Sequence, residues 1–188
     1  MSDFISYEER LKDFDWSIAE KELEYKYGDV INIGWYCSDR ICLKGKADKI
    51  ALIYEGFGGT EKKYSFNDIR LASNTIGTFL WSLGIKHGDR VCVFMDRIPE
   101  LYFSFIGVLK IGAIDQLLFS IFGDESLFVR LDNAQTRAII TQRKHLHKIR
   151  KIRKRLPYLE FIIVVDHIKN KTLEKTRRCI QSCRFSPC

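Results

Sequence analysis

Apolar residues recur every three or four positions between Ser65 and Gly84, a spacing typical of a helix with one buried face. Ser65 lies three residues before Asp68, so these two side chains can form a capping box at the helix start. Gly84 follows the last apolar position and suits the left-handed conformation in which many helices end. The pattern therefore predicts an amphipathic helix whose buried face is formed by Ile69, Ala72, Ile76, Phe79, Leu80 and Leu83.

Short apolar runs alternate with further helical patterns along the rest of the chain. Uninterrupted apolar runs are typical of strands in parallel sheets that are covered on both faces. The expected strands are Val91–Phe94, Ala113–Phe119, Ala138–Ile140 and Phe161–Val165. The expected helices between them are Pro99–Gly112, Asp124–Leu131 and Lys144–Leu156. Because strands and helices alternate, the sequence predicts an α/β fold with a mostly parallel sheet.

A glycine-rich segment, Gly56–Lys63, precedes the first of these helices. Glycines followed by lysine can bind phosphate, but a phosphate-binding loop leads into a helix whose N-terminal amides face the anion. Here the loop connects two short strand patterns, Ile50–Tyr54 and Lys63–Phe66. The favoured interpretation is therefore a hairpin with a glycine-rich turn.

The composition fits a folded domain, because 46% of the 188 residues are hydrophobic and 13% are aromatic. The acidic stretch Met1–Asp15 does not resemble a secretory signal. The most apolar long window, Ile98–Leu118, contains Glu100, Lys110 and Asp115, which argues against a membrane-spanning helix. We therefore expect a soluble, cytoplasmic protein without a membrane partner.

Charge is unevenly distributed along the chain. Residues 1–142 carry 17 basic and 21 acidic side chains, whereas residues 143–188 carry 14 and 3. The basic run Arg143–Arg155 lacks the interleaved aromatic residues expected of a nucleic-acid surface. A solvated helix face is favoured, with contact to a phosphate-bearing cofactor as the alternative, and no nucleic-acid partner is expected.

The polar residues show no catalytic or metal-binding pattern. Three cysteines are scattered, and three crowd the last ten residues at spacings that do not suit a four-ligand zinc site. No histidine is spaced to pair with a cysteine or serine nucleophile. Asp96-Arg97 follows a strand, where ligands often bind in α/β sheets, but a loop ion pair or a charge at a helix start is favoured.

Residues 49–166 resemble the N-terminal subdomain of the adenylate-forming synthetases, and the acetyl- and medium-chain acyl-CoA synthetases in particular. The order and spacing of several blocks carry the resemblance: Lys49–Glu55, Lys63–Ile69, Leu83–Val91, Met95–Leu101, Lys110–Ile114 and Leu118–Gly123. On this basis residues 1–48 form an N-terminal segment, residues 49–166 a partial synthetase subdomain, and residues 167–188 an atypical basic tail that contains cysteines.

The resemblance implies a ligase that uses ATP, Mg²⁺ and coenzyme A (CoA) to convert a carboxylic acid into an acyl-adenylate and then a thioester. The family's glycine-rich triphosphate loop, ribose-binding motif and C-terminal lysine are not found in these 188 residues. The chain is therefore expected to be a truncated N-terminal part without catalytic residues or activity of its own. None of the three cofactors is expected to bind it tightly.

The resemblance also implies a CoA-binding role for three residues. Phe119 and Phe122 match a loop that lies near the CoA nucleotide in relatives, and Arg150 falls near a basic stretch that reaches the CoA phosphate. Ser120-Ile121 stands where some acetyl-CoA synthetases have two glycines. The alternative is a non-catalytic binding or regulatory subunit, which pairs with a second chain that carries the missing subdomains or associates with its own copy.

Overall fold

The computed structural model describes residues 6–26, 28–166 and 179–180. It divides the chain into two compact units, Met1–Ile31 and Asn32–Cys188. In the first unit, Ser6 and Glu9 form a capping box at the start of α1 (Tyr7–Lys12), and Asp15 caps α2 (Trp16–Leu23). The domain boundaries expected from the resemblance stay a prediction, and most of the tail 167–188 lies outside the described residues.

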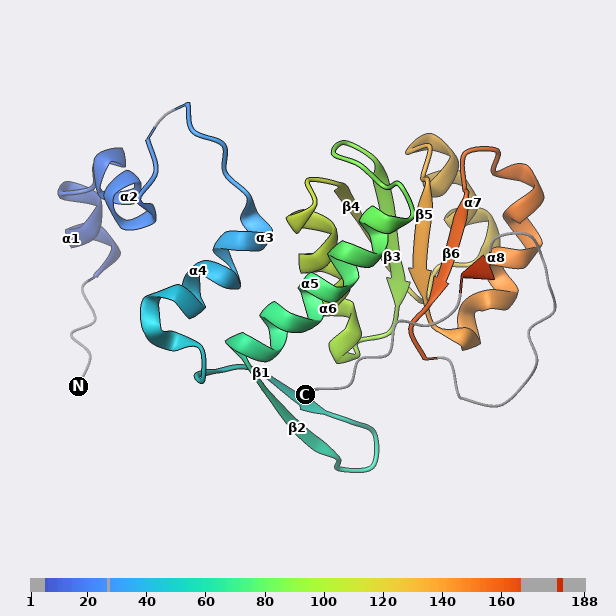
Figure 1. The fold of residues 1–188 in the computed structure, drawn as a ribbon, viewed down its shortest axis with the longest axis horizontal. Coiled ribbons are helices and arrows are strands. Elements are labelled where there is room, and N and C mark those ends of the chain that lie inside the picture. Colours follow the sequence, from blue (N-terminus) through green and yellow to red (C-terminus); the bar gives the residue numbers. More distant parts are fainter. Residues whose placement is uncertain (1–5, 27, 167–178, 181–188) are drawn as a thin grey trace. The chain divides into compact units, whose positions relative to one another are not determined.

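The second unit is built around a parallel sheet with the strand order β4-β3-β5-β6-β7 (Figure 1). The strands are β3 (Arg90–Met95), β4 (Ile114–Phe119), β5 (Ala138–Thr141), β6 (Phe161–Val164) and β7 (Cys179–Ile180). Val91 of β3 pairs with Asp115 of β4 on one side and with Ala138 of β5 on the other. The predicted α/β fold with a parallel sheet is confirmed.

Helices cover both faces of this sheet, as the apolar strands require. On one face, α5 (Phe66–Ser82) and α6 (Pro99–Lys110) pack against Val91, Val93 and Met95 of β3. On the other, α7 (Asp124–Asn133) and α8 (Leu146–Ile152) pack against Cys92 and Phe94 (Figure 1). Successive residues of β3 therefore serve two separate cores.

The ends of α5 match the sequence prediction. The Ser65 side chain accepts a hydrogen bond from the Asp68 amide, and the Asp68 carboxylate accepts one from the Ser65 amide, which completes the capping box. At the other end Gly84 has φ of +80°, which is the left-handed conformation that glycine adopts without strain. These local signals explain why the predicted and observed helix bounds agree closely.

The backbones of α5 and α6 approach closely at Gly107. A Cβ atom built at Gly107 would lie 2.8 Å from the Ser73 carbonyl oxygen and 2.9 Å from Ile76 Cβ. Contacts this short are absent from normal packing, so a side chain at this position would force the helices apart. The glycine is therefore a packing requirement of this helix pair.

Lys110, at the end of α6, fixes the segment that enters the second unit. Its ammonium group lies 2.5 Å from the Asp39 carboxylate and donates to the Asn74 side chain at 2.7 Å. Its carbonyl oxygen accepts a hydrogen bond from the side chain of Asn32, directly before α3 (Ile33–Tyr36). Asp39 begins α4 (Asp39–Ile41), which continues into a π-helical turn over Cys42–Lys46, so one lysine joins α3 and α4 to α5 and α6.

The glycine-rich segment forms the turn of a hairpin, which confirms the favoured interpretation. β1 (Ile50–Glu55) and β2 (Glu61–Ser65) pair in antiparallel fashion (Figure 1). Gly58 and Gly59 have φ of +97° and +80°, so the turn uses the freedom of glycine for its own backbone.

The single helix expected over Lys144–Leu156 is wrong in detail. The structure breaks it into a 3₁₀ turn (Arg143–His145), the helix α8 and a second 3₁₀ turn (Arg153–Arg155). Pro157 accounts for the end, because a residue before proline disfavours helical backbone angles, and Leu156 has ψ of 86°.

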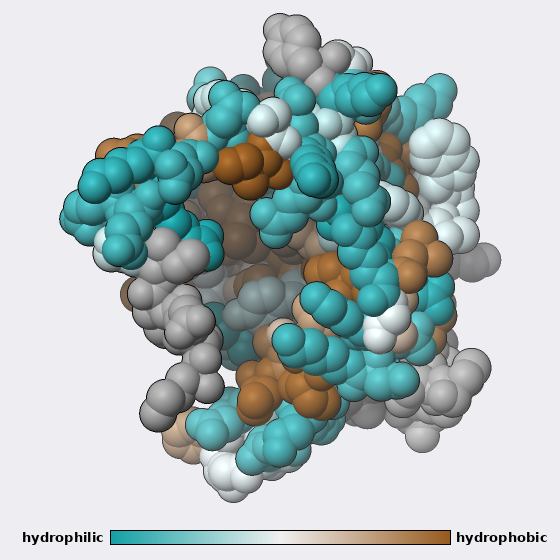
Figure 2. Space-filling model, turned by 90° about the vertical axis from the view of Figure 1, so that its left-hand side faces the viewer, coloured by the Kyte–Doolittle hydropathy of each residue, from teal (hydrophilic) through white to brown (hydrophobic). Residues whose placement is uncertain are grey.

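Apolar side chains remain exposed where the sheet ends at β4. Among the described strands β4 pairs only with β3, and Ile114, Leu117 and Phe119 are each at least half exposed. Hydrophobic residues also reach the surface among hydrophilic ones on the face drawn in Figure 2. The expected association with a second chain or a second copy stays a prediction.

Replacing Gly107 by alanine tests the close contact of α5 and α6, because a crowded and an uncrowded helix predict opposite changes in the free energy of unfolding. In an uncrowded helix Gly→Ala stabilises by about 1 kcal/mol. We expect Gly107→Ala to destabilise instead, by roughly 1–3 kcal/mol, because the new methyl group meets the Ser73 carbonyl oxygen and the Ile76 side chain of α5. Urea unfolding measures the change, with Thr78→Ala on the exposed face of α5 as the control. Stabilisation by Gly107→Ala would show that the two helices are not in close contact.

Candidate functional site

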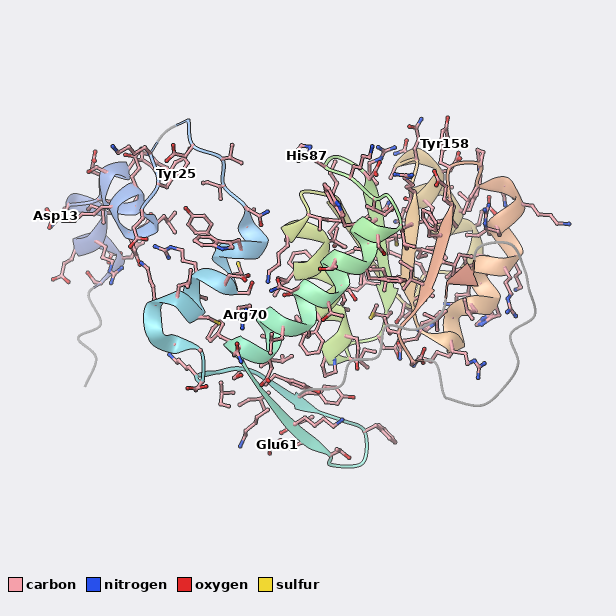
Figure 3. The ribbon with its side chains drawn as sticks, viewed as in Figure 1. Asp13, Tyr25, Glu61, Arg70, His87 and Tyr158 are labelled. Atoms are coloured by element: carbon pink, nitrogen blue, oxygen red, sulfur yellow. The ribbon has the colours of Figure 1, made fainter. Side chains whose placement is uncertain are left out.

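The carboxyl ends of the parallel strands bring polar residues to one edge of the sheet. Asp96 follows β3, Ser120 follows β4, Gln142 follows β5, and Asp166 lies two residues beyond the end of β6. In open α/β sheets this edge is where ligands bind. The opposite edge carries the turn that contains His87 and the loop that contains Tyr158, both labelled in Figure 3.

Asp96 is the centre of a hydrogen-bonded cluster at the carboxyl edge. Its carboxylate forms an ion pair with Lys144 and lies 2.9 Å from Nε2 of His145. Its backbone amide donates to the Gln142 side chain at 2.8 Å. Hydrogen bonds from Lys144, Ser120 and His145 hold the pKa of Asp96 well below its usual range, so the carboxylate is ionised. The loop ion pair favoured for Asp96 is confirmed.

The loop after β4 presents apolar side chains beside this cluster. Phe119 is 71% exposed and Ile121 is 85% exposed, whereas Phe122 packs against the core beneath α7 and α8. The rings of Phe119 and Phe122 lie 6.1 Å apart, and the Phe122 amide donates to the Phe119 carbonyl at 3.1 Å. Phe122 is therefore anchored, and Phe119 remains open to solvent.

Several side chains of the basic run that contains α8 bind neighbouring elements, whereas the sequence favoured a helix face that is exposed to solvent. Lys148 donates to the carbonyl oxygens of Ser120 and Phe122, at 2.8 and 2.9 Å. Two further cations reach the start of α7: Lys151 pairs with Asp124, and Arg155 forms two hydrogen bonds with Glu125. Much of the positive charge thus holds α8 to α7 and to the loop after β4.

The structure brings together two of the three residues expected to contact CoA. Phe119 ends β4 and Phe122 lies in the loop that follows, but Arg150 is exposed on α8 and makes no hydrogen bond or ion pair within the described part of the chain. Arg150 lies two residues, or about 200° around the helix, from Lys148. It therefore faces away from the loop that Lys148 binds, and all three proposed roles stay predictions.

Asp115 is a buried carboxylate outside this cluster. Both of its oxygens are buried, and neither has a hydrogen-bond partner among the described residues. Pairing with Val91 places the side chain on the sheet face covered by α5 and α6. Burial raises the pKa of Asp115 to about 7, because the ionised form has lost its water without gaining a donor.

The described residues contain neither a metal-binding cluster nor a membrane-spanning helix. No group of three or more His, Cys, Asp and Glu side chains is arranged to hold a metal ion within the described ranges. No helix in that part of the chain combines the length and apolarity needed to cross a membrane.

The chain matches the family described as AMP-binding enzyme over residues 40–183. It is 35% identical to the acetyl-coenzyme A synthetase of Bacillus subtilis over 161 residues, which cover 85% of this chain and 28% of the relative. It is 32% identical to the Dictyostelium discoideum acetyl-coenzyme A synthetase over 126 residues, which cover 66% and 18%. The chain thus spans less than a third of the length of these relatives.

Solved structures with a similar fold include two CoA ligases. The Brucella canis acyl-CoA synthetase matches 89% of this chain and 30% of its own, with a TM-score of 0.78 and 25% identity. The anthranilate CoA ligase AuaEII, solved with anthranoyl-AMP, matches 68% and 23%, with a TM-score of 0.62 and 28% identity.

Asp115 gives a prediction on pH. Its folded pKa of about 7 lies above the unfolded value of 3.8, so folding favours the protonated form. Stability should therefore fall as pH rises between these two values and stay low above them. We expect Asp115→Asn to be more stable than the parent chain by roughly 2–4 kcal/mol at pH 8 and nearly equal to it at pH 4.

Denaturant unfolding at the two pH values measures this difference. The control is Asp48→Asn, at an exposed position, which we expect to leave the pH profile unchanged. An Asp115→Asn variant that follows the parent chain at both pH values would mean that the carboxylate is hydrated in the folded protein.

Proposed function

Because the chain belongs to the AMP-binding enzyme family, we propose that it supplies the CoA-nucleotide contact of an acyl-CoA ligase. In such a ligase a carboxylate attacks the α-phosphorus of ATP and releases pyrophosphate. The CoA thiolate then attacks the acyl carbonyl carbon and releases AMP. Acetyl- and acyl-CoA-forming relatives support this reaction class.

The exposed aromatic ring of Phe119 at the carboxyl edge of the sheet is the observation that carries this proposal. A nucleotide base gains about 1–3 kcal/mol by stacking on an aromatic side chain. Phe119 is 71% exposed, and the pairing of β4 with β3 places it beside Met95. It therefore offers a flat apolar surface on a rigid element, which is suited to the adenine of CoA.

The described residues fit CoA better than they fit a magnesium–triphosphate site. The Asp96 and Asp124 carboxylates are already paired with Lys144 and Lys151. The 188 residues contain no Ser/Thr/Gly-rich loop that ends in lysine and leads from a strand to a helix. We therefore assign this chain no step at the triphosphate and propose that it contributes to CoA binding rather than to adenylation.

When bound, CoA supplies the thiol that accepts the acyl group, and this chain's residues hold the other end of the molecule. Phe119 would contact the base, while Phe122 and the core beneath it would keep the loop in place. Positioning of this kind lowers the entropic cost of bringing the thiol to its target. Phe119 and Ile121 are largely exposed, so this chain alone would cover only part of the ligand and its affinity should be weak.

A titration with CoA tests the assignment of Phe119. We expect the chain to bind CoA weakly and Phe119→Ala to raise the dissociation constant by about tenfold, as expected for the loss of one stacking contact. Phe57→Ala is the matched control, because Phe57 is fully exposed at the tip of the hairpin and far in sequence from the loop. NMR chemical shifts measured at millimolar CoA give the dissociation constants.

Two outcomes would contradict the proposal. One is that CoA produces no saturable shift changes in the parent chain. The other is that the Phe119→Ala and Phe57→Ala variants bind CoA equally well, which would leave binding without an aromatic contact at the carboxyl edge.

A further inference from the structure

Lys148 stands out among the basic side chains of α8 because its ammonium group binds backbone carbonyls. It donates to the carbonyl oxygens of Ser120 and Phe122. Lys151, one turn further along α8, instead pairs with the Asp124 carboxylate at 2.8 Å and keeps 64% of its side chain exposed. Two lysines of one helix therefore have different surroundings, although they carry the same charge.

The two carbonyls that Lys148 binds belong to Ser120 and Phe122, which flank Ile121 in the turn after β4. On one side, Phe119 is fixed by its pairing with Met95 in the sheet. On the other, Phe122 is held by the core and by Arg130, whose guanidinium lies 4.3 Å from the ring centroid. The backbone between them runs through Ser120 and Ile121, and the Lys148 ammonium binds on both sides of Ile121.

The geometry of the ammonium group suits this role. A lysine side chain has three donors and no acceptor, so one group can bind two carbonyl oxygens two residues apart. Lys148 is itself held in place, because its helix is anchored by the buried residues Ile149 and Ile152 and its ammonium lies 5.8 Å from the centre of the Phe94 ring. The loop backbone is thus fastened to the core of the domain.

We infer that Lys148 is a positioning residue for CoA binding: it holds the backbone between Phe119 and Phe122, so that Ile121 stays exposed to the ligand beside Phe119, which the sheet already fixes. This inference rests on the proposed function, and it assigns Lys148 no direct contact with CoA. Hydrogen bonds to a charged group contribute more than neutral ones, so the loss of both should loosen the loop measurably.

The test compares CoA affinity in three variants of the full chain. We expect Lys148→Met to raise the dissociation constant about tenfold. Without the two hydrogen bonds the loop is less ordered in the free chain, so ordering it on binding costs more free energy. Lys151→Met removes the same charge from the same helix and should change the constant less than about twofold, since exposed pairs contribute little. Lys148→Arg keeps the cationic donor and should recover most of the affinity.

A second measurement follows the order of the loop in the absence of CoA, by hydrogen exchange. The amide of Phe122 donates to the Phe119 carbonyl, so its hydrogen exchange reports whether the turn is formed. We expect faster exchange of this amide in Lys148→Met than in the parent chain or Lys151→Met, while amides of β3 and β5 exchange as before. A purely global loss of stability would speed exchange in those strands as well.

The outcomes separate the two proposals. If the parent chain does not bind CoA, the proposed function fails, and the positioning role fails with it. If the parent chain binds CoA and Lys148→Met binds it equally well, only the positioning role is overturned. An equal loss of affinity in Lys148→Met and Lys151→Met would assign the effect to charge and would also overturn it, as would unchanged exchange at Phe122.

Discussion

The strands β3, β5 and β6 must be covered by other elements on both faces of the sheet, and the rest of the second unit depends on this constraint. These strands have residues buried on both sides, so neither face can be left to water. The pair α5 and α6 meets this need on one face, and α7 and α8 meet it on the other. Because the helices occupy the faces, polar side chains gather at the strand ends. The site at the carboxyl edge follows from this arrangement.

The same constraint explains the unusual contacts of the helices. The α5–α6 pair closes tightly only because Gly107 lacks a side chain where Ser73 approaches. The opposite layer is held by charge as well as by apolar packing, because Lys151 of α8 and Arg155 of the 3₁₀ turn after it pair with carboxylates of α7. The strand β4 at the edge is less well covered, and it carries both the exposed Phe119 and the Asp115 carboxylate, which has no hydrogen-bond partner among the described residues.

Local signals in the sequence predicted the helices and strands well, but they could not predict contacts between residues that are distant in sequence. The capping residues Ser65 and Asp68 and the terminal Gly84 gave the bounds of α5 to within a residue or two. The apolar runs gave the strands and their parallel arrangement. The strand order, with β4 at one edge, could not be derived, because it depends on which crossover lies on which face rather than on any local pattern.

The site was predicted only in part, for the same reason. The sequence favoured a loop ion pair or a helix-start charge for Asp96, but could not identify its partners Lys144 and His145, which lie 48 and 49 residues away. The resemblance pointed to Phe119 and Phe122, and the structure places Phe119 at the end of β4 and Phe122 in the loop that follows. The sequence could not reveal the role of Lys148, because nothing distinguishes a lysine that binds backbone carbonyls from the other lysines of a basic run. Asp115 resembled an ordinary strand residue until its burial was known.

Mapping the CoA-induced NMR shift changes along the chain shows whether CoA binds at the carboxyl edge of the sheet. The largest changes should fall on the loop after β4 and on the neighbouring residues after β3 and β5. The amino edge, marked by His87 and Tyr158 in Figure 3, should stay unperturbed. Changes concentrated at the amino edge, or spread evenly over the chain, would show that CoA does not bind at the carboxyl edge.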